Sequence, residues 1–296
     1  GTFTTSLTLV HWQGLDAEKG SVAEFRRLDK VASLSLPLSS SPRPELLLNV
    51  ALGIYASRAR QHRLAIELFK RASKDIPNGV GGVHRLHRML GMSYLMSGQP
   101  HAGIEELTRA HSACPAHEYE CLQLGLNELG LAEHRFGDKD NAQPRFKDSL
   151  ALALQRGDSL SEATALNNLG VVYADRGEKA KALNYYEHAL ELRRRTGDVS
   201  GEAVTLRNIG QVYSAGRDVV TALSYYERSL TLSQNVGDTS VEATTLNQLG
   251  WVYFTLGNQP KALEYFERSL LLSQKIDDIS SEANTLNTIG LAFNSL

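Results

Sequence analysis

Cysteine is scarce in this sequence, and long apolar runs are missing. Cys114 and Cys121 are the two cysteines, too few for the disulfide framework of a small secreted domain. We therefore expect both to be thiols in a reducing compartment, the cytoplasm. No stretch reaches the roughly 18 consecutive apolar residues that a membrane-spanning helix needs, so we do not expect a membrane protein.

Neither sign of charge is in surplus. The chain has 31 Lys and Arg against 33 Asp and Glu, which gives a formal net charge of −2. Because a protein that binds nucleic acid through its phosphates carries clustered positive charge, nucleic acid is not an expected partner. The first residues, GTFTTSLTLV, lack an initiator methionine and the basic region of a secretory signal. We expect the chain to be a piece of a longer protein.

Motifs for catalysis and cofactor binding are also missing. The sequence has no Gly-Lys-Ser/Thr phosphate loop, no His-Glu-x-x-His and no Gly-x-Ser-x-Gly. The glycines of NGVGGVH, at 78–84, stand between expected helices rather than after a strand, which favours a plain loop over a phosphate site. We therefore expect no catalytic residue and no cofactor, and predict that the chain is not an enzyme.

Histidines gather between positions 84 and 134, near both cysteines. Cys114, His117 and Cys121 are close in sequence, but their spacing matches no familiar zinc pattern. We interpret the histidines as surface residues and the cysteines as buried thiols, and expect no metal site.

What the sequence does contain is a repeat of 40 residues. The stretch ATALNNLGVVYADRGEKAKALNYYEHAL begins at Ala163, and similar stretches begin at Ala203, Ala243 and Ala283. Weaker copies precede it. One glycine marks every copy: Gly53, Gly91, Gly130, Gly170, Gly210, Gly250 and Gly290. Such regular recurrence indicates an array of structural repeats.

Each repeat contains two stretches with the apolar spacing of a helix, here named helix A and helix B. Leu166, Leu169 and Tyr173 share one face of helix A, and a second apolar stripe follows a break at Gly177. The marker glycine falls inside helix A, where the missing side chain allows helix B to approach closely. The tyrosines of helix B are interpreted as packing residues: Tyr185, Tyr186, Tyr225 and Tyr226.

Turn signals separate the repeats. A glycine in the left-handed conformation commonly ends a helix, and Gly-Asp pairs stand at three such places: Gly157-Asp158, Gly197-Asp198 and Gly237-Asp238. Ser159 with Glu162, and Thr239 with Glu242, then fit the capping box that opens a helix.

This pattern resembles the tetratricopeptide repeat, an antiparallel helix pair with a usual period of about 34 residues. The resemblance rests on small and aromatic positions: Leu166, Gly170, Tyr173, Ala182, Tyr186 and Ala189. HEAT repeats reach similar lengths, but the seven-residue spacing of glycines and the Ala-x-x-x-aromatic pattern favour the tetratricopeptide type. The resemblance implies an all-α fold, a right-handed superhelical solenoid of helix pairs with a concave inner surface.

We assign residues 45–296 to this array, as six helix pairs and a lone seventh helix A, and expect the protein to continue past Leu296. Residues 1–44 are predicted to form a capping segment or the end of an upstream domain. A helix is predicted around 22–31, before the breaking stretch PLSSSPRP, and the first residues are compatible with a strand.

The resemblance also implies a binding groove lined by helix A, at positions three before and one after each marker glycine. The first set is Arg88, Asn127, Asn167, Arg207, Asn247 and Asn287. The second set is Met92, Leu131, Val171, Gln211, Trp251 and Leu291. Asparagine offers a donor and an acceptor to the main chain of a bound peptide. The alternative is that these asparagines support helix A or face water.

Two further features of this groove suggest what it binds. Arg88, Arg135 and Arg207 favour carboxylates. Trp251 with Phe254 offers an apolar anchor of the kind found at binding hot spots.

These residues predict a non-catalytic protein-interaction module that binds a peptide or a partner's helix. Arrays of this kind resemble bacterial sensor and scaffold arms attached to caspase-like proteases, nucleotide-switch ATPases, histidine kinases or transcription regulators, although a eukaryotic peptide-binding adaptor fits as well. Two other functions stay open. The chain could regulate a catalytic domain of its own protein, or it could be an oligomerisation scaffold that self-associates through its C-terminal repeat face.

Overall fold

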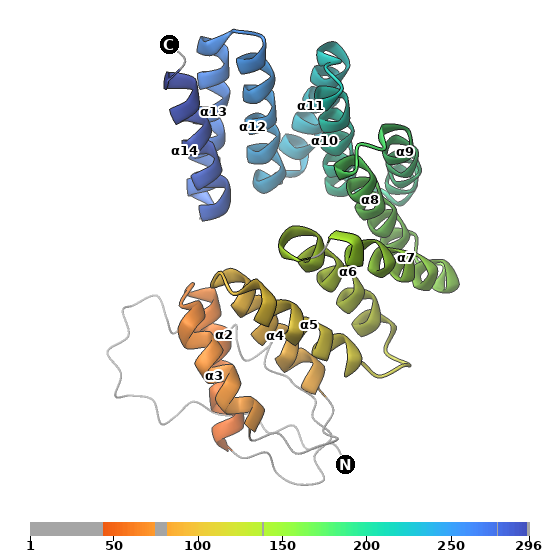
Figure 1. Ribbon diagram of the computed structural model, residues 1–296, viewed down its shortest axis with the longest axis vertical. Helices are drawn as coiled ribbons and strands as arrows, with labels where there is room; N and C mark the ends of the chain where they lie inside the picture. The colour runs from red at the N-terminus through yellow and green to blue at the C-terminus, as the bar shows by residue number, and fades with distance from the viewer. Residues whose placement is uncertain (1–43, 75–81, 138, 277, 295–296) are drawn as a thin grey trace. The chain divides into compact units, whose positions relative to one another are not determined.

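The computed structural model describes residues 44–74, 82–137, 139–276 and 278–294. Every regular element within these ranges is an α-helix (Figure 1), which confirms the all-α prediction. None of these helices combines the length and the apolar character needed to cross a bilayer. The helix expected around 22–31, the strand at the start of the chain and most of the glycine-containing loop at 78–84 lie outside the described residues.

The chain forms two compact units, Gly1–Asp138 and Lys139–Leu296. In the first, each helix packs on the next along the chain. Its helices are α2 (Pro44–Arg58), α3 (His62–Lys74), α4 (Val83–Met96), α5 (Pro100–Ser112) and α6 (Tyr119–Phe136). Their core includes Val50, Phe69 and Leu90, and a smaller cluster forms around Leu107 and Leu129.

The second unit is the more regular of the two. Helices A and B of each repeat make its most extensive contacts, and the pairs stack in chain order (Figure 1). Its helices are α7 (Lys139–Arg156), α8 (Ser159–Asp175), α9 (Lys179–Thr196), α10 (Val199–Ala215), α11 (Val219–Val236), α12 (Thr239–Thr255), α13 (Gln259–Lys275) and α14 (Ile279–Asn294). Helices α8, α10, α12 and α14 are therefore A helices.

The marker glycine is the point at which helices A and B come closest. A Cβ atom added to Gly170 would lie 2.5 Å from Cε1 of Tyr186, and Tyr186 is 2% exposed. The same clash with a buried ring sixteen residues later recurs at Gly53 with Phe69, Gly210 with Tyr226 and Gly250 with Phe266. The structure thus agrees with a packing role for Tyr186 and Tyr226, whereas Tyr185 and Tyr225 are half-buried and stack on Tyr173 and Tyr213.

Gly91 and Gly290 have different surroundings. Gly91 faces Leu107 instead of a ring, with a hypothetical Cβ 2.9 Å from the leucine Cγ. Gly130 is buried in α6. Gly290 has no atom within 4 Å of the added Cβ.

The turns between repeats end one helix and cap the next. Gly157, Gly197 and Gly237 have φ values of 66°, 71° and 69°, which confirms the predicted left-handed helix ends. The predicted capping boxes, however, are wrong. The N-caps are Asp158 and Asp238, one residue before Ser159 and Thr239, because each aspartate carboxylate already accepts hydrogen bonds from the first-turn amides.

The Gly170→Ala substitution is expected to lower the free energy of unfolding by about 1–2 kcal/mol. Overpacking against Tyr186 costs about 1–3 kcal/mol, and the better helix propensity of alanine recovers up to about 1 kcal/mol. Gly290→Ala is the matched control, because it gains the propensity without a clash. Urea denaturation followed by circular dichroism measures both, and equal effects of the two substitutions would contradict the packing argument.

Candidate functional site

The A helices of the second unit place the predicted binding residues in two rows. Positions three before and one after each marker glycine are four residues apart, so they lie on the same side of a helix. Successive A helices are in contact, α8 with α10, α10 with α12 and α12 with α14. The helix-A face is defined here by Asn167, Val171, Arg207, Gln211, Asn247, Trp251, Phe254, Asn287 and Leu291.

The polar row of this face bonds each A helix to the next. Asn167 Oδ1 accepts hydrogen bonds from Asn208 Nδ2 at 3.0 Å and from Thr205 Oγ1 at 3.3 Å, and Asn167 is only 5% exposed. These bonds give Asn167 a role in packing between repeats, in line with the alternative that the asparagines support helix A. The amide oxygen of Asn167 is therefore occupied, and its side chain is buried.

Two other members of the row make equivalent bonds and remain partly accessible. Arg207 Nη1 donates to Thr244 Oγ1 at 2.6 Å, and Asn247 Nδ2 donates to Thr285 Oγ1 at 3.1 Å. Both side chains are half-buried, whereas Asn287 on α14 is exposed.

A buried hydroxyl network behind the row was not predicted from the sequence. Ser229 Oγ donates to the carbonyl oxygen of Ala203 at 2.8 Å and lies 3.2 Å from Thr245 Oγ1. Ser269 repeats both contacts one repeat later, with Ala243 and Thr285. The recurrence of serine and threonine at 40-residue spacing on otherwise apolar stripes was the signal available in the sequence.

The second row presents apolar and amide side chains. Trp251 is half-buried, and its ring meets Phe254 edge to face with centroids 5.5 Å apart and Phe266 at 6.1 Å. Gln211 is exposed, Val171 is half-buried and Leu291 is 47% exposed. The structure thus brings Trp251 and Phe254 together, as the anchor hypothesis requires.

The predicted binding residues of the first unit have internal partners. Arg88 binds the carboxylate of Glu128 with two hydrogen bonds, of 2.6 Å from Nε and 2.7 Å from Nη2. The guanidinium of Arg88 is therefore paired with a carboxylate of this chain, whereas we had expected it to pair with a carboxylate of a bound partner. Arg135 is exposed with its guanidinium 5.0 Å from the Phe136 ring, and Asn127 is half-buried.

A pocket of about 750 Å³ opens in the first unit. Its walls come from α4, α5 and α6, with Ile54 from α2. Its charged and polar lining includes His84, Arg85, Arg88, Glu118, Glu120 and Glu128. Sequence reasoning missed this pocket because four helices contribute to it, although the clustering of histidines was a partial signal.

The cysteines beside this pocket are not thiols in the structure. Cys114 and Cys121 form a disulfide with a Cα–Cα distance of 5.8 Å, which corrects the expectation of buried thiols. The turn between α5 and α6 brings the two residues together, although they are seven positions apart. The pair links the end of α5 to the first turn of α6.

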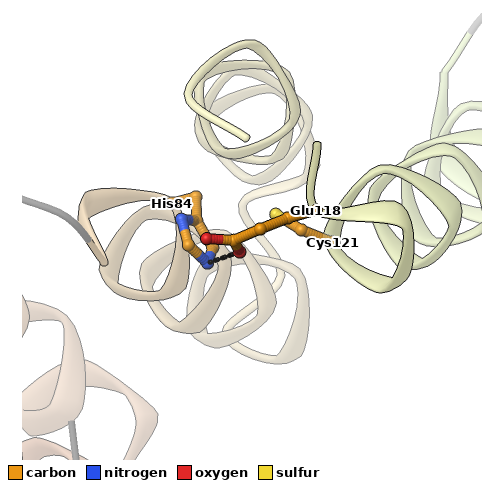
Figure 2. A group of neighbouring side chains, drawn as sticks. All are labelled: His84, Glu118 and Cys121. Atoms are coloured by element: carbon orange, nitrogen blue, oxygen red, sulfur yellow. Dashed lines mark ion pairs between the residues drawn. The ribbon is translucent and has the colours of Figure 1, made fainter. Parts of the chain in front are cut away.

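His84 lies against the same turn (Figure 2). Its Nε2 atom is 3.9 Å from Oε2 of Glu118, the N-cap residue of α6. Burial lowers the pKa of the His84 imidazole below its usual value, an effect that Glu118 opposes and that Arg85 and Arg88 support. The expectation of surface histidines is therefore wrong for His84, which is buried, while His117 is exposed.

Comparison with known proteins identifies the family. The family model described as tetratricopeptide repeat matches residues 121–195 and 201–275, which together are about half of the chain, and the chain belongs to this family. No curated protein matches it.

Solved structures share the fold at low sequence identity. RapI in its apo form is 15% identical with a TM-score of 0.61, over 79% of this chain and 99% of RapI. A Rap protein complexed with Competence and Sporulation Factor is 12% identical with a TM-score of 0.57, over 92% of this chain and 80% of that chain. The Cut9–Hcn1 hetero-tetramer of the APC/C gives 19% identity and a TM-score of 0.58 over 91% of this chain. This chain spans 46% of the matched chain there.

Asn167→Ala is expected to destabilise the protein by about 1–3 kcal/mol, because the buried amide of Asn208 loses its acceptor. Asn287→Ala, at the same repeat position but exposed, should change the free energy of unfolding by no more than about 0.5 kcal/mol. Chemical denaturation of both variants measures the difference. A neutral Asn167→Ala would show that the inter-repeat bonds contribute nothing to stability.

Proposed function

We propose that this chain is a non-catalytic protein-interaction module, the sensor or scaffold arm of a larger protein that acts in the cytoplasm. Its site is the helix-A face of the second unit, and its partner is a peptide segment or a helix of another protein. The observation that carries the proposal is the half-buried aromatic pair Trp251 and Phe254 on that face. Partly exposed tryptophan beside well-packed apolar residues is typical of binding hot spots.

The neighbours of this pair supply what a peptide needs. Exposed Gln211 and Asn287 offer donors and acceptors for a main chain, while Leu291 extends the apolar surface onto α14. Arg207 and Asn247 keep part of their surface accessible between these residues. Arg88, Asn127 and Arg135 are proposed as a secondary contact area within the first unit. Asn167 is omitted because it is buried.

The comparisons are compatible with this proposal. One similar Rap structure is complexed with Competence and Sporulation Factor, and Cut9 is found together with Hcn1. At 12% and 19% identity, these likenesses define the fold, so binding by this chain depends on the helix-A face itself. A tetratricopeptide fold without a catalytic motif supports the assignment as a non-enzyme.

A second candidate function is self-association through α14. Leu286, Leu291 and Phe293 are exposed on this helix, Phe293 by 58%. Two such faces would bury apolar surface against each other, which favours association. Light scattering of the purified chain distinguishes this candidate, because Phe293→Ser should then convert a dimer into a monomer.

Selection from a library of random peptides tests the leading proposal. The wild-type chain should enrich peptides with a shared sequence pattern, and Trp251→Ala should weaken their binding by more than about tenfold, since truncating a hot spot costs about 2 kcal/mol or more. Leu271→Ala is the matched control, because Leu271 is a 66% exposed apolar residue on a B helix, α13. Peptides that bind Trp251→Ala as tightly as wild type would move the site away from this face.

A further inference from the structure

An imidazole, a carboxylate and a sulfur atom meet at one wall of the first unit's pocket. Figure 2 shows His84 of α4 facing Glu118 and Cys121 at the beginning of α6. One ligand atom from each of the three residues lies within 4.8 Å of the other two. This group is independent of the helix-A face and of the function proposed above.

The sulfur atom of Cys114 is next to this group. Cys114 Sγ is bonded directly to Cys121 Sγ, so breaking that bond leaves two free thiols beside His84 and Glu118. Two cysteines, a histidine and a carboxylate are four ligands that zinc accepts in tetrahedral geometry. In the oxidised chain the two sulfur atoms are bonded to each other, so neither can bind zinc as a thiolate.

We propose that His84, Cys114, Glu118 and Cys121 form a zinc site that exists only while the Cys114–Cys121 disulfide is reduced. Zinc bonds of roughly 2.0–2.3 Å place neighbouring ligand atoms about 3.3–3.8 Å apart. The ligand atoms of His84, Glu118 and Cys121 already lie within 4.8 Å of one another and reach that geometry by moving about 1 Å closer. The two sulfur atoms, which are bonded to each other in the oxidised chain, move apart once the disulfide is reduced. The Glu118 side chain is 41% exposed, so it has room to rotate toward the other ligands.

Local structure prepares these side chains for a metal. His84 is 8% exposed and fixed on α4, so its ring is already ordered before binding. Cys121 is in the first turn of α6, where the unpaired amides and the helix dipole favour a thiolate. Glu118 is the N-cap residue of the same helix, so it lies at the same end of α6 as Cys121.

The switch between the two states is a two-electron exchange. A dithiol reductant transfers two electrons to the disulfide, the S–S bond breaks, two protons are taken up, and the reductant becomes a disulfide. Zinc then displaces the two thiol protons into solvent and binds the thiolates. In the reverse direction, hydrogen peroxide accepts two electrons from the thiolates and two protons, which gives two water molecules, the disulfide and free zinc.

Zinc titration of the tag-free full chain tests the proposal. The protein is reduced with a dithiol, freed of reductant without oxygen, and titrated with zinc against a coloured chelator. We expect one zinc ion per reduced chain, none on the oxidised chain, and release of the bound zinc on addition of hydrogen peroxide. Absence of zinc binding by the reduced chain, or equal binding by the oxidised chain, would overturn the proposal.

Variants identify the ligands. Cys121→Ser and His84→Ala should weaken zinc binding by at least about tenfold, since even residues that only support a ligand cost about 10–100-fold. Glu118→Gln tests the site without altering a buried side chain, and should also weaken binding. His117→Ala is the control, because His117 is the sequence neighbour of Glu118 but exposed and outside the group. Circular dichroism checks that each variant is helical. The assignment is contradicted if His117→Ala loses zinc binding, or if both Glu118→Gln and His84→Ala retain it.

Discussion

The contact between a glycine of helix A and a buried ring of helix B is the constraint on which the repeat depends. At Gly170 the absent side chain allows the Tyr186 ring to lie directly against the backbone. A glycine inside a helix costs about 1 kcal/mol, whereas burying an aromatic side chain contributes more than this. The positions three before and one after the glycine lie about 60° and 100° around helix A from it, so they flank the contact with the ring.

This geometry explains why the two rows of the helix-A face have different roles. Asn167 and Asn247 are neutral amides and Arg207 is a larger cation, yet each bonds to the following A helix. The polar row thereby sets the register of neighbouring repeats. The other row changes from Gln211, which is exposed, to Trp251, whose ring packs against the buried Phe266 ring.

The periodicity of the sequence predicted the fold. It could not predict contacts between residues of different repeats, for a physical reason. The spacing of Leu166, Gly170 and Tyr173 is local, so it predicted helix A and its buried side. The spacing does not specify which residue of the next repeat contacts Asn167, so the hydrogen bonds between repeats were not predicted. The disulfide was missed for the same reason, because pairing of Cys114 with Cys121 depends on the path of the turn between α5 and α6.

Departure from the repeat pattern also accounts for the chemistry of the first unit. At the position sixteen residues after Gly91, a leucine replaces the ring, and this Leu107 lines the pocket. A leucine fills less space than a tyrosine or phenylalanine, so the helices around it leave room that the strict repeats fill. The His84, Glu118 and Cys121 group borders that room. In the second unit, buried polar residues such as Asn167, Thr205 and Asn208 bond to each other. In the repeat where Leu107 replaces the aromatic ring, the pocket lets side chains such as His84 be ordered by packing and still be accessible to a small ligand.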